Sequence, residues 1–182
     1  GGARYNTSYI QGVGMGTITD CFSSLKYNVY DKNHVSMERL LDALKEDFKG
    51  NEILLHQLDQ APKYGNDNDY ADDILKRLFH TFHGLVTDKP NAKGGVYRIN
   101  LLPTTCHVYF GEITGALPDG RKKGVPLSEG ISPVQGADRC GPTAVLKSAA
   151  KIDHLKTGGT LLNQKFLREL FKEEKGLRSE ER

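Results

Sequence analysis

Residues 97–111 of this chain read Tyr-Arg-Ile-Asn-Leu-Leu-Pro-Thr-Thr-Cys-His-Val-Tyr-Phe-Gly. The stretch from Val96 to Leu102 is apolar enough on both faces to predict an interior β-strand, which should end at Pro103 because proline cannot donate to a ladder. A glycine-rich and mostly uncharged loop follows as far as Gly136, with a sharp turn at Pro118-Asp119-Gly120. Surface loops usually carry more charge, so we expect this loop to fold inward and shape a cavity.

The rest of the chain predicts helices that alternate with short strands. Apolar residues at helical spacing indicate the strongest helix over residues 71–85. Ser36 is a good N-cap for a helix that ends near Gly50, and Asn51 for a shorter helix that stops before Pro62. We also expect a helix capped by Thr19-Asp20, a helix over residues 141–150, a strand over 158–166 and a helix from Leu167 onward. This alternation predicts an α/β architecture, either layered or barrel-shaped.

Composition narrows the class of protein. A chain of 182 residues can bury a sizeable core, and a net charge of +2 argues against a surface dedicated to nucleic acid or membrane. The longest apolar runs are far too short to span a bilayer. Three widely spaced cysteines fit a reducing cytoplasm better than a disulfide framework: they are Cys21, Cys106 and Cys140.

Two polar or glycine-rich patterns suggest ligand sites but lack the required spacing. The glycines of residues 12–16 do not form a phosphate-binding loop, so we interpret them as positions where backbones pack closely. The acidic stretch at residues 66–73 lacks the glycine and glutamate that a calcium loop needs in register. Acids near the positive end of a helix are the better interpretation.

The histidine, cysteine and lysine residues also lack the partners that a metal site, a nucleophile or a phosphate site would need. His80 and His83 lie three residues apart, but the sequence offers no further zinc ligands at recognisable spacing. Cys106 is the most tempting nucleophile, yet a reactive thiolate needs a helix N-terminus or a cation that the sequence does not show, so a small buried residue is favoured. The pair Lys122-Lys123 is expected to lie on a solvated turn. We therefore predict no metal site and no catalytic residue in this chain.

Several separated motifs, in the same order, resemble those of glycyl radical enzymes, the family of pyruvate formate-lyase. They are the opening Gly-Gly-Ala-Arg-Tyr-Asn, the turn from Thr114 to Arg121, the stretch from Gly130 to Gly136, and Gly158-Gly159-Thr160. The resemblance extends from Gly1 to about Phe166. Residues 5–12 look most like the branch that dehydrates hydroxyproline.

The resemblance implies a ten-stranded α/β barrel of two five-stranded halves. It also implies a glycyl radical near the C-terminus, installed by an activating enzyme that uses an iron–sulfur cluster and S-adenosylmethionine. That radical passes to a cysteine, whose thiyl takes hydrogen from the substrate. The family's Cys-x-Glu and Arg-Val-x-Gly-Tyr motifs are absent here, so we expect residues 1–182 to be part of the barrel domain of a longer protein, with no cofactor bound and no activity of their own.

By the same resemblance, the substrate-binding residues in this chain are Leu102, Thr104 and Thr105. The position of Thr104 lines the substrate cavity in relatives, and a hydroxyl there suits a small polar substrate because it can satisfy a buried polar group. We expect Cys106 to be non-catalytic, since relatives commonly have serine there. A structural role for Thr104, ending a strand before a turn, stays open.

We therefore expect this chain to be part of a cytoplasmic radical lyase or dehydratase, with hydroxyproline dehydration as the leading reaction. Its partners would be a small polar substrate, the activating enzyme and, in the whole protein, a second copy in a homodimer. Formate acetyltransferase or glycerol/diol dehydratase activity is an alternative within the family, and a barrel from anaerobic ribonucleotide reduction is a weaker one. A non-catalytic binding protein is the alternative from another class.

Overall fold

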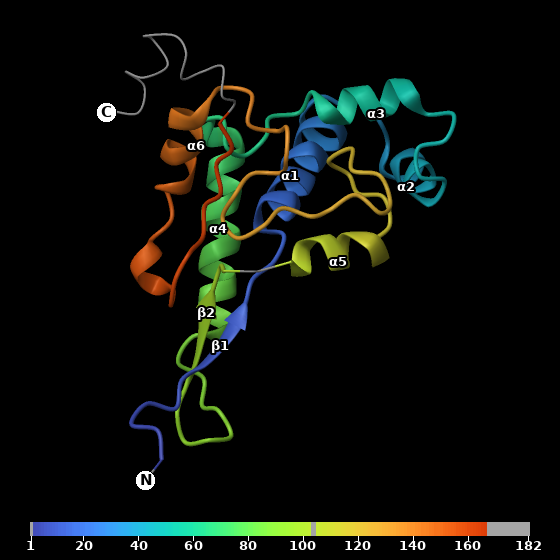
Figure 1. Ribbon diagram of the computed structural model, residues 1–182. Helices are drawn as coiled ribbons and strands as arrows, with labels where there is room; N and C mark the ends of the chain where they lie inside the picture. Colours follow the sequence, from blue (N-terminus) through green and yellow to red (C-terminus); the bar gives the residue numbers. More distant parts are fainter. Residues whose placement is uncertain (1, 103–104, 167–182) are drawn as a thin grey trace.

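A computed structural model describes residues 2–102 and 105–166 of the chain, and Figure 1 shows a small sheet that extends below most of the helices. Two strands are present, β1 (Ser8–Gln11) and β2 (Tyr97–Asn100). The helices are α1 (Met15–Leu25), continued by the π-helix η1 (Lys26–Asp31), α2 (Met37–Lys45), α3 (Glu52–Asp59), α4 (Asp69–Val86), α5 (Cys106–Ile113), α6 (Pro142–Ala149) and the short 3₁₀-helix η2 (His154–Lys156). The prediction of mixed helix and strand is confirmed.

The two strands run parallel, with Ser8 opposite Tyr97 and Gln11 opposite Asn100. On the other side of β2, an isolated parallel bridge joins Leu101 to Thr160. In Figure 1 both arrows point toward the helices, so the carboxyl ends of the strands meet at the edge nearest α1 and α5. The strand predicted over residues 96–102 is confirmed in a shorter form. The strand predicted over 158–166 is wrong in extent, since residues 158–161 bond the backbone of Ile99 and Leu101 but form only an isolated bridge at Thr160.

One core lies between α4 and the sheet. The apolar face of α4, including Leu75 and Phe79, packs against Ile99 and Leu101, all with no exposed surface. Leu75 and Phe79 lie on one face of α4 because its apolar residues recur with the 3.6-residue period of a helix. A second core joins α2 and α3 around Leu40, Phe48, Leu54 and Leu58. Burying such side chains stabilises the fold by roughly 1.5–3 kcal/mol each.

Sequence signals place most helices correctly. The Ser36 hydroxyl accepts the N–H of Arg39 at 3.2 Å, which confirms it as the cap of α2. Asn68 caps α4 in the same way, accepting the N–H of Tyr70 at 3.0 Å. Asn51 does stand before α3, but its side chain makes no capping bond. The helix expected from Leu167 onward lies outside the described residues.

The start of α1 differs from the prediction. Thr19 and Asp20 do not cap a helix: both are buried inside α1, which begins four residues earlier at Met15. The cap comes from a distant residue, because the Ser128 hydroxyl accepts the N–H of Thr17 at 2.9 Å. The Thr17 hydroxyl accepts the N–H of Ser128 in return, at 2.8 Å. A partner 111 positions away leaves no local signal in the sequence.

The glycines near α1 confirm the close-packing interpretation. A Cβ at Gly12 would lie 2.5 Å from Cδ2 of Leu101, and one at Gly16 would lie 2.8 Å from the carbonyl oxygen of Ser132. Gly14 has φ of +81°, a left-handed conformation that L-residues rarely adopt. These three positions bring the backbone between β1 and α1 against the loop around Ser128. Among the described helices, none is long and apolar enough to cross a membrane.

Candidate functional site

The predicted substrate residues lie where β2 ends. Leu102 is half-buried and Thr105 is exposed, whereas Thr104 lies outside the described residues. The N–H of Leu102 donates to Oε1 of Gln11, the last residue of β1, at 3.3 Å. The structure thus brings Leu102 beside Gln11, a residue that the sequence analysis did not single out. Ligands commonly bind at the carboxyl ends of parallel strands, which supports this edge as a candidate site.

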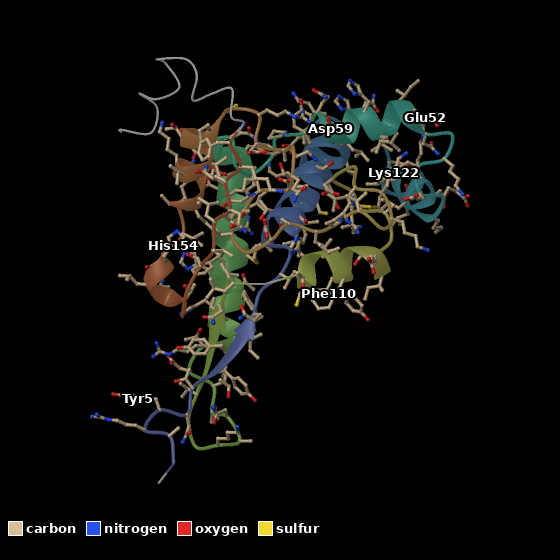
Figure 2. All side chains as sticks on the ribbon, in the orientation of Figure 1. Tyr5, Glu52, Asp59, Phe110, Lys122 and His154 are labelled. Atoms are coloured by element: carbon tan, nitrogen blue, oxygen red, sulfur yellow. The ribbon has the colours of Figure 1, made fainter. Side chains whose placement is uncertain are left out.

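Helix α5 follows immediately and was not predicted. Thr105 is its N-cap but makes no side-chain capping bond, and Cys106 is its first residue. Cys106 is exposed, so the expectation of a small buried residue is wrong for this position. Helix α5 was missed because the consecutive valine, tyrosine and phenylalanine at residues 108–110 favour a strand as much as a helix. Phe110 lies on the face of α5 that points away from α1 (Figure 2).

Arg121 ties the predicted turn to the end of α5. The turn itself is confirmed, since the N–H of Gly120 donates to the carbonyl of Leu117 at 3.1 Å. The Arg121 guanidinium is buried and donates to the carbonyls of Gly111 at 2.5 Å and Gly115 at 2.7 Å. Its Nε donates to the carbonyl of Val125 at 2.7 Å. A cation among the last carbonyls of a helix satisfies acceptors that have no partner within the helix.

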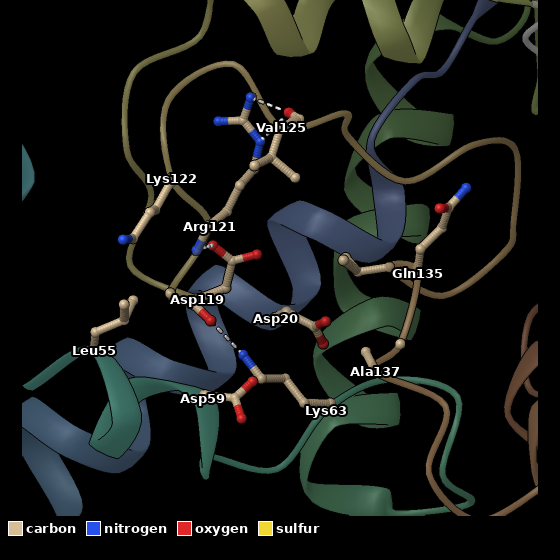
Figure 3. A pocket seen from close by; sticks show the side chains of 13 residues that line it. Asp20, Leu55, Asp59, Lys63, Asp119, Arg121, Lys122, Val125, Gln135 and Ala137 are labelled. Atoms are coloured by element: carbon tan, nitrogen blue, oxygen red, sulfur yellow. Dashed lines mark hydrogen bonds between the residues drawn. The ribbon is translucent and has the colours of Figure 1, made fainter. Parts of the chain in front are cut away.

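The turn lines one side of a cavity of about 340 Å³, shown in Figure 3. Its walls come from α1, the end of α3, and the loop residues 119–125 and 134–137. The expectation that the loop after β2 shapes a cavity is therefore confirmed. Lys63 is buried beneath the turn and donates to the carbonyl of Asp119 at 2.6 Å. Asp59 lies at the rim, where it binds Arg139 at 2.6 Å.

Asp20 is the unusual group of this cavity. Its Oδ1 accepts the N–H of Tyr64 at 2.8 Å, but Oδ2 is buried without a hydrogen-bond partner among the described residues. Burial raises the pKa of Asp20 from 3.8 to about 7, although the nearby Lys63 lowers it in part. Burial also raises the pKa of Asp119 and of the Cys21 thiol. Cys21 is thus a poor nucleophile, because the thiolate is the reactive form.

The other polar patterns have structural roles. Asp69 and Asp72 stand in the first turn of α4, as expected for acids at a helix N-terminus, and both bind Lys151, at 2.8 and 2.7 Å. His80 and His83 pack against the ring of Phe79. Within the described ranges, no three His, Cys, Asp or Glu side chains gather as metal ligands.

The remaining basic and histidine candidates either lie close to another side chain or are exposed to solvent. Lys122 and Lys123 are exposed, as predicted for a solvated turn. His107 is buried and lies 3.9 Å from Glu129. The sequence analysis named none of Asp20, Lys63 or Asp119 as site residues. Their burial arises from contacts between distant segments, so no local pattern could have identified them.

Comparison with known proteins gives the family. The pyruvate formate lyase-like model matches residues 1–111, and the glycine radical model matches residues 127–181. The chain is 57% identical to trans-4-hydroxy-L-proline dehydratase of Clostridioides difficile over 97% of its own length. It is 37% identical to (2S)-3-sulfopropanediol dehydratase of Klebsiella oxytoca over 93% of its length. It spans only 23% and 21% of these two relatives.

Comparison with solved structures also finds dehydratases of this kind. The hydroxyproline dehydratase of C. difficile, crystallised with trans-4-hydroxy-L-proline, matches 99% of the chain with a TM-score of 0.93 and 56% identity. The B12-independent glycerol dehydratase from Clostridium butyricum matches 98% with a TM-score of 0.90 and 42% identity. The chain covers 23% of each of these structures.

Proposed function

Because this chain belongs to the pyruvate formate lyase-like family of glycyl radical enzymes, we propose that the whole protein is a radical dehydratase acting on trans-4-hydroxy-L-proline. The observation that carries this proposal is the 57% identity to trans-4-hydroxy-L-proline dehydratase along nearly the whole chain. Identity to the sulfopropanediol dehydratase is 37% over a similar span. The difference favours hydroxyproline over a diol as the substrate.

The whole protein would build the ten-stranded barrel of the family, with residues 1–182 forming part of its wall. The glycine radical match implies a glycyl radical that an activating enzyme installs. We further propose that this activating enzyme uses S-adenosylmethionine and an iron–sulfur cluster, that the protein works in the cytoplasm, and that it forms a homodimer. The chain lacks a Gly-Tyr dipeptide and a Cys-x-Glu sequence, so the radical chemistry requires other parts of the protein.

This chain's contribution is to bind and orient the substrate at the end of β2. Leu102 supplies an apolar surface beside Gln11, and Thr105 stands exposed at the start of α5. The proposed role of the Thr104 hydroxyl is to bind a polar group of the substrate, which must lose its hydration on entering a closed barrel. Fixing a small substrate relative to a radical site is the chief means by which such a wall accelerates the reaction.

The test is a substrate panel with the anaerobically activated whole protein. Trans-4-hydroxy-L-proline should be dehydrated at least tenfold faster than glycerol or 1,2-propanediol at equal concentration. Preferential turnover of glycerol would instead support the diol dehydratase alternative, which rests on the lower identity of 42% to the glycerol dehydratase. Turnover of none of the three would make a binding function the better account.

Thr104→Val tests the substrate role of that hydroxyl. We expect about a tenfold increase in KM for trans-4-hydroxy-L-proline, because one hydrogen bond to a buried polar group is lost. The control is Thr81→Val, since Thr81 is exposed on α4 and bonds its own helix. Unchanged kinetics for Thr104→Val would leave Thr104 with the structural role of ending the strand.

A further inference from the structure

Strands β1 and β2 end together, with Gln11 opposite Asn100. The N–H of Ser8 donates to the carbonyl of Val96 at 3.0 Å, and the N–H of Gly12 donates to the carbonyl of Asn100 at 2.8 Å. The chain then turns at Gly14 into α1. The ladder between the two strands therefore stops at Asn100, and the following N–H, that of Leu102, needs a different acceptor.

Gln11 supplies that acceptor from its side chain. Its Oε1 accepts the N–H of Leu102 at 3.3 Å, so the carboxamide extends the ladder by one further bond. An N–H can only donate, and this fixes which end of the carboxamide faces Leu102. The Nε2 end is then left to donate to another group. The two N–H donors of Nε2 find no acceptor among the residues that the structure describes, and Gln11 is exposed.

The backbone that Gln11 binds is also held from the opposite side. The N–H of Leu101 donates to the carbonyl of Gly159 at 2.9 Å, and the N–H of Leu161 donates to the carbonyl of Leu101 at 2.9 Å. Leu101 itself has no exposed surface. The carboxamide of Gln11 is thus attached to a rigid part of the sheet, which is the condition for a donor to be preorganised.

We propose that Gln11 orients the substrate at the end of β2. Its Oε1 stays bound to Leu102, and its Nε2 donates to an acceptor oxygen on the substrate, a carboxylate in the case of an amino acid such as hydroxyproline. The inference rests on the proposed function, because it places the substrate at this edge. An amide donor fixed beside Leu102 selects substrates that carry such an oxygen, since an analogue without it leaves the donor unpaired.

The experiment measures binding of trans-4-hydroxy-L-proline to the whole protein by calorimetry before activation, and turnover after activation. Gln11→Glu keeps an acceptor for Leu102, removes both donors and adds a negative charge. Gln11→Met has similar length and loses both donor and acceptor. Matched changes at Gln60, which is exposed at the end of α3, serve as controls.

We expect both Gln11 variants to bind about tenfold more weakly or worse, with Gln11→Glu at least as weak as Gln11→Met because its charge repels a carboxylate. The Gln60 variants should bind like the wild type. If Gln11→Glu restores wild-type binding, the residue only supports Leu102 and the substrate contact is refuted. Wild-type binding by both variants also refutes it.

Failure of the proposed function has a different signature. A wild-type protein that neither binds nor dehydrates trans-4-hydroxy-L-proline refutes the proposed substrate, and the role of Gln11 with it. A wild-type protein that does both, alongside Gln11 variants of unchanged affinity, refutes the role of Gln11 alone.

Discussion

Asp20 illustrates how much a single residue depends on the surrounding fold. In sequence it follows a threonine and looks like a helix cap, yet in the structure it is 1% exposed and holds the N–H of Tyr64. Its second oxygen has no partner among the described residues, so the protonated carboxyl is favoured over the carboxylate. Neither its burial nor its raised pKa could be predicted from the sequence, because both come from the loop that lines the cavity.

Stability should fall with pH through the raised pKa of Asp20. Folded Asp20 has a pKa of about 7, against 3.8 for the ordinary carboxyl, so the folded state holds the proton more tightly. Its contribution is complete below about pH 4, is lost as pH rises toward about 7, and is constant above that, with a total on the order of a few kcal/mol. The measurement is the thermal midpoint of the whole protein from pH 4 to 9.

Asp20→Asn is the variant that isolates this effect. The amide oxygen still accepts the N–H of Tyr64, and no charge can form, so the thermal midpoint should exceed that of the wild type above pH 7 and should fall less between pH 4 and 7. Asp138→Asn, at an exposed position, should keep the wild-type profile. Parallel profiles for Asp20→Asn and the wild type would contradict the account of Asp20.

At the scale of elements, the sequence predicts what local periodicity and caps determine. Helix α2 was predicted because its apolar stripe follows the capping residue Ser36, and α4 because its apolar residues recur at helical spacing over residues 71–85. Helix α5 was missed because its residues favour strand locally and its ends are fixed by remote contacts. The carbonyl of His107 accepts the N–H of Leu127 at 3.0 Å, and Arg121 holds the carbonyl of Gly111.

The same reasoning separates the predicted from the unpredicted parts of the candidate site. Leu102 and Thr105 were named from the resemblance to glycyl radical enzymes, in which the end of this strand lines the substrate cavity, and their substrate role stays a prediction. Gln11 was not named, because only the parallel pairing of β1 with β2 brings residues 91 positions apart into contact. The strand expected over residues 158–166 is present only as a bridge at Thr160, because its apolar pattern shows β-propensity but cannot show how far the pairing with β2 extends.

Arg121→Lys should destabilise the end of α5. Lysine keeps the charge but cannot bind several carbonyls at once, so buried acceptors such as the carbonyls of Gly115 and Val125 lose their donors. We expect a loss of about 2–4 kcal/mol in the free energy of unfolding, measured with denaturant on the whole protein. Lys122→Ala, at the exposed neighbour, should change it by about 0.5 kcal/mol or less. Equal effects of the two changes would refute the role of Arg121.

Gly111→Ala tests the contact between α5 and the loop. A Cβ at Gly111 would lie 2.5 Å from the carbonyl oxygen of Val125, so the helix or the loop must shift. We expect a loss of about 1–3 kcal/mol. Gly84→Ala is the matched control within α4, where a Cβ meets nothing within 4 Å, and alanine should stabilise the helix by roughly 0.5–1 kcal/mol. Stabilisation by both changes would contradict the described packing.

At the scale of the whole molecule, the described residues form a two-stranded sheet in which β1 is an edge strand. β1 pairs only with β2 in this part of the chain, and its residues Tyr9 and Ile10 are exposed. Apolar side chains also stand exposed on α1 and α5, among them Ile18, Phe22 and Ile113. Unpaired edges and apolar patches of this kind usually face another part of the same protein or another chain.

We therefore expect residues 1–182, expressed alone, to self-associate. Light scattering should report a mass above that of a monomer, and Ile10→Lys should reduce it because a charge on an edge strand opposes pairing between edges. Lys substitution at Leu155, which is 94% exposed and far from the edge strand in sequence, is the control. A clean monomer that melts cooperatively would show that this segment is stable without the rest of the proposed barrel.

We propose that this chain is part of the wall of a radical dehydratase. The most direct measurement is electron paramagnetic resonance of the whole protein after anaerobic activation, followed by addition of trans-4-hydroxy-L-proline. The account predicts a carbon-centred radical split by a single hydrogen, as a glycyl radical requires, together with dehydration of the substrate. Dehydration by a protein that shows no such radical, or a radical without dehydration of any small polar substrate, would contradict it.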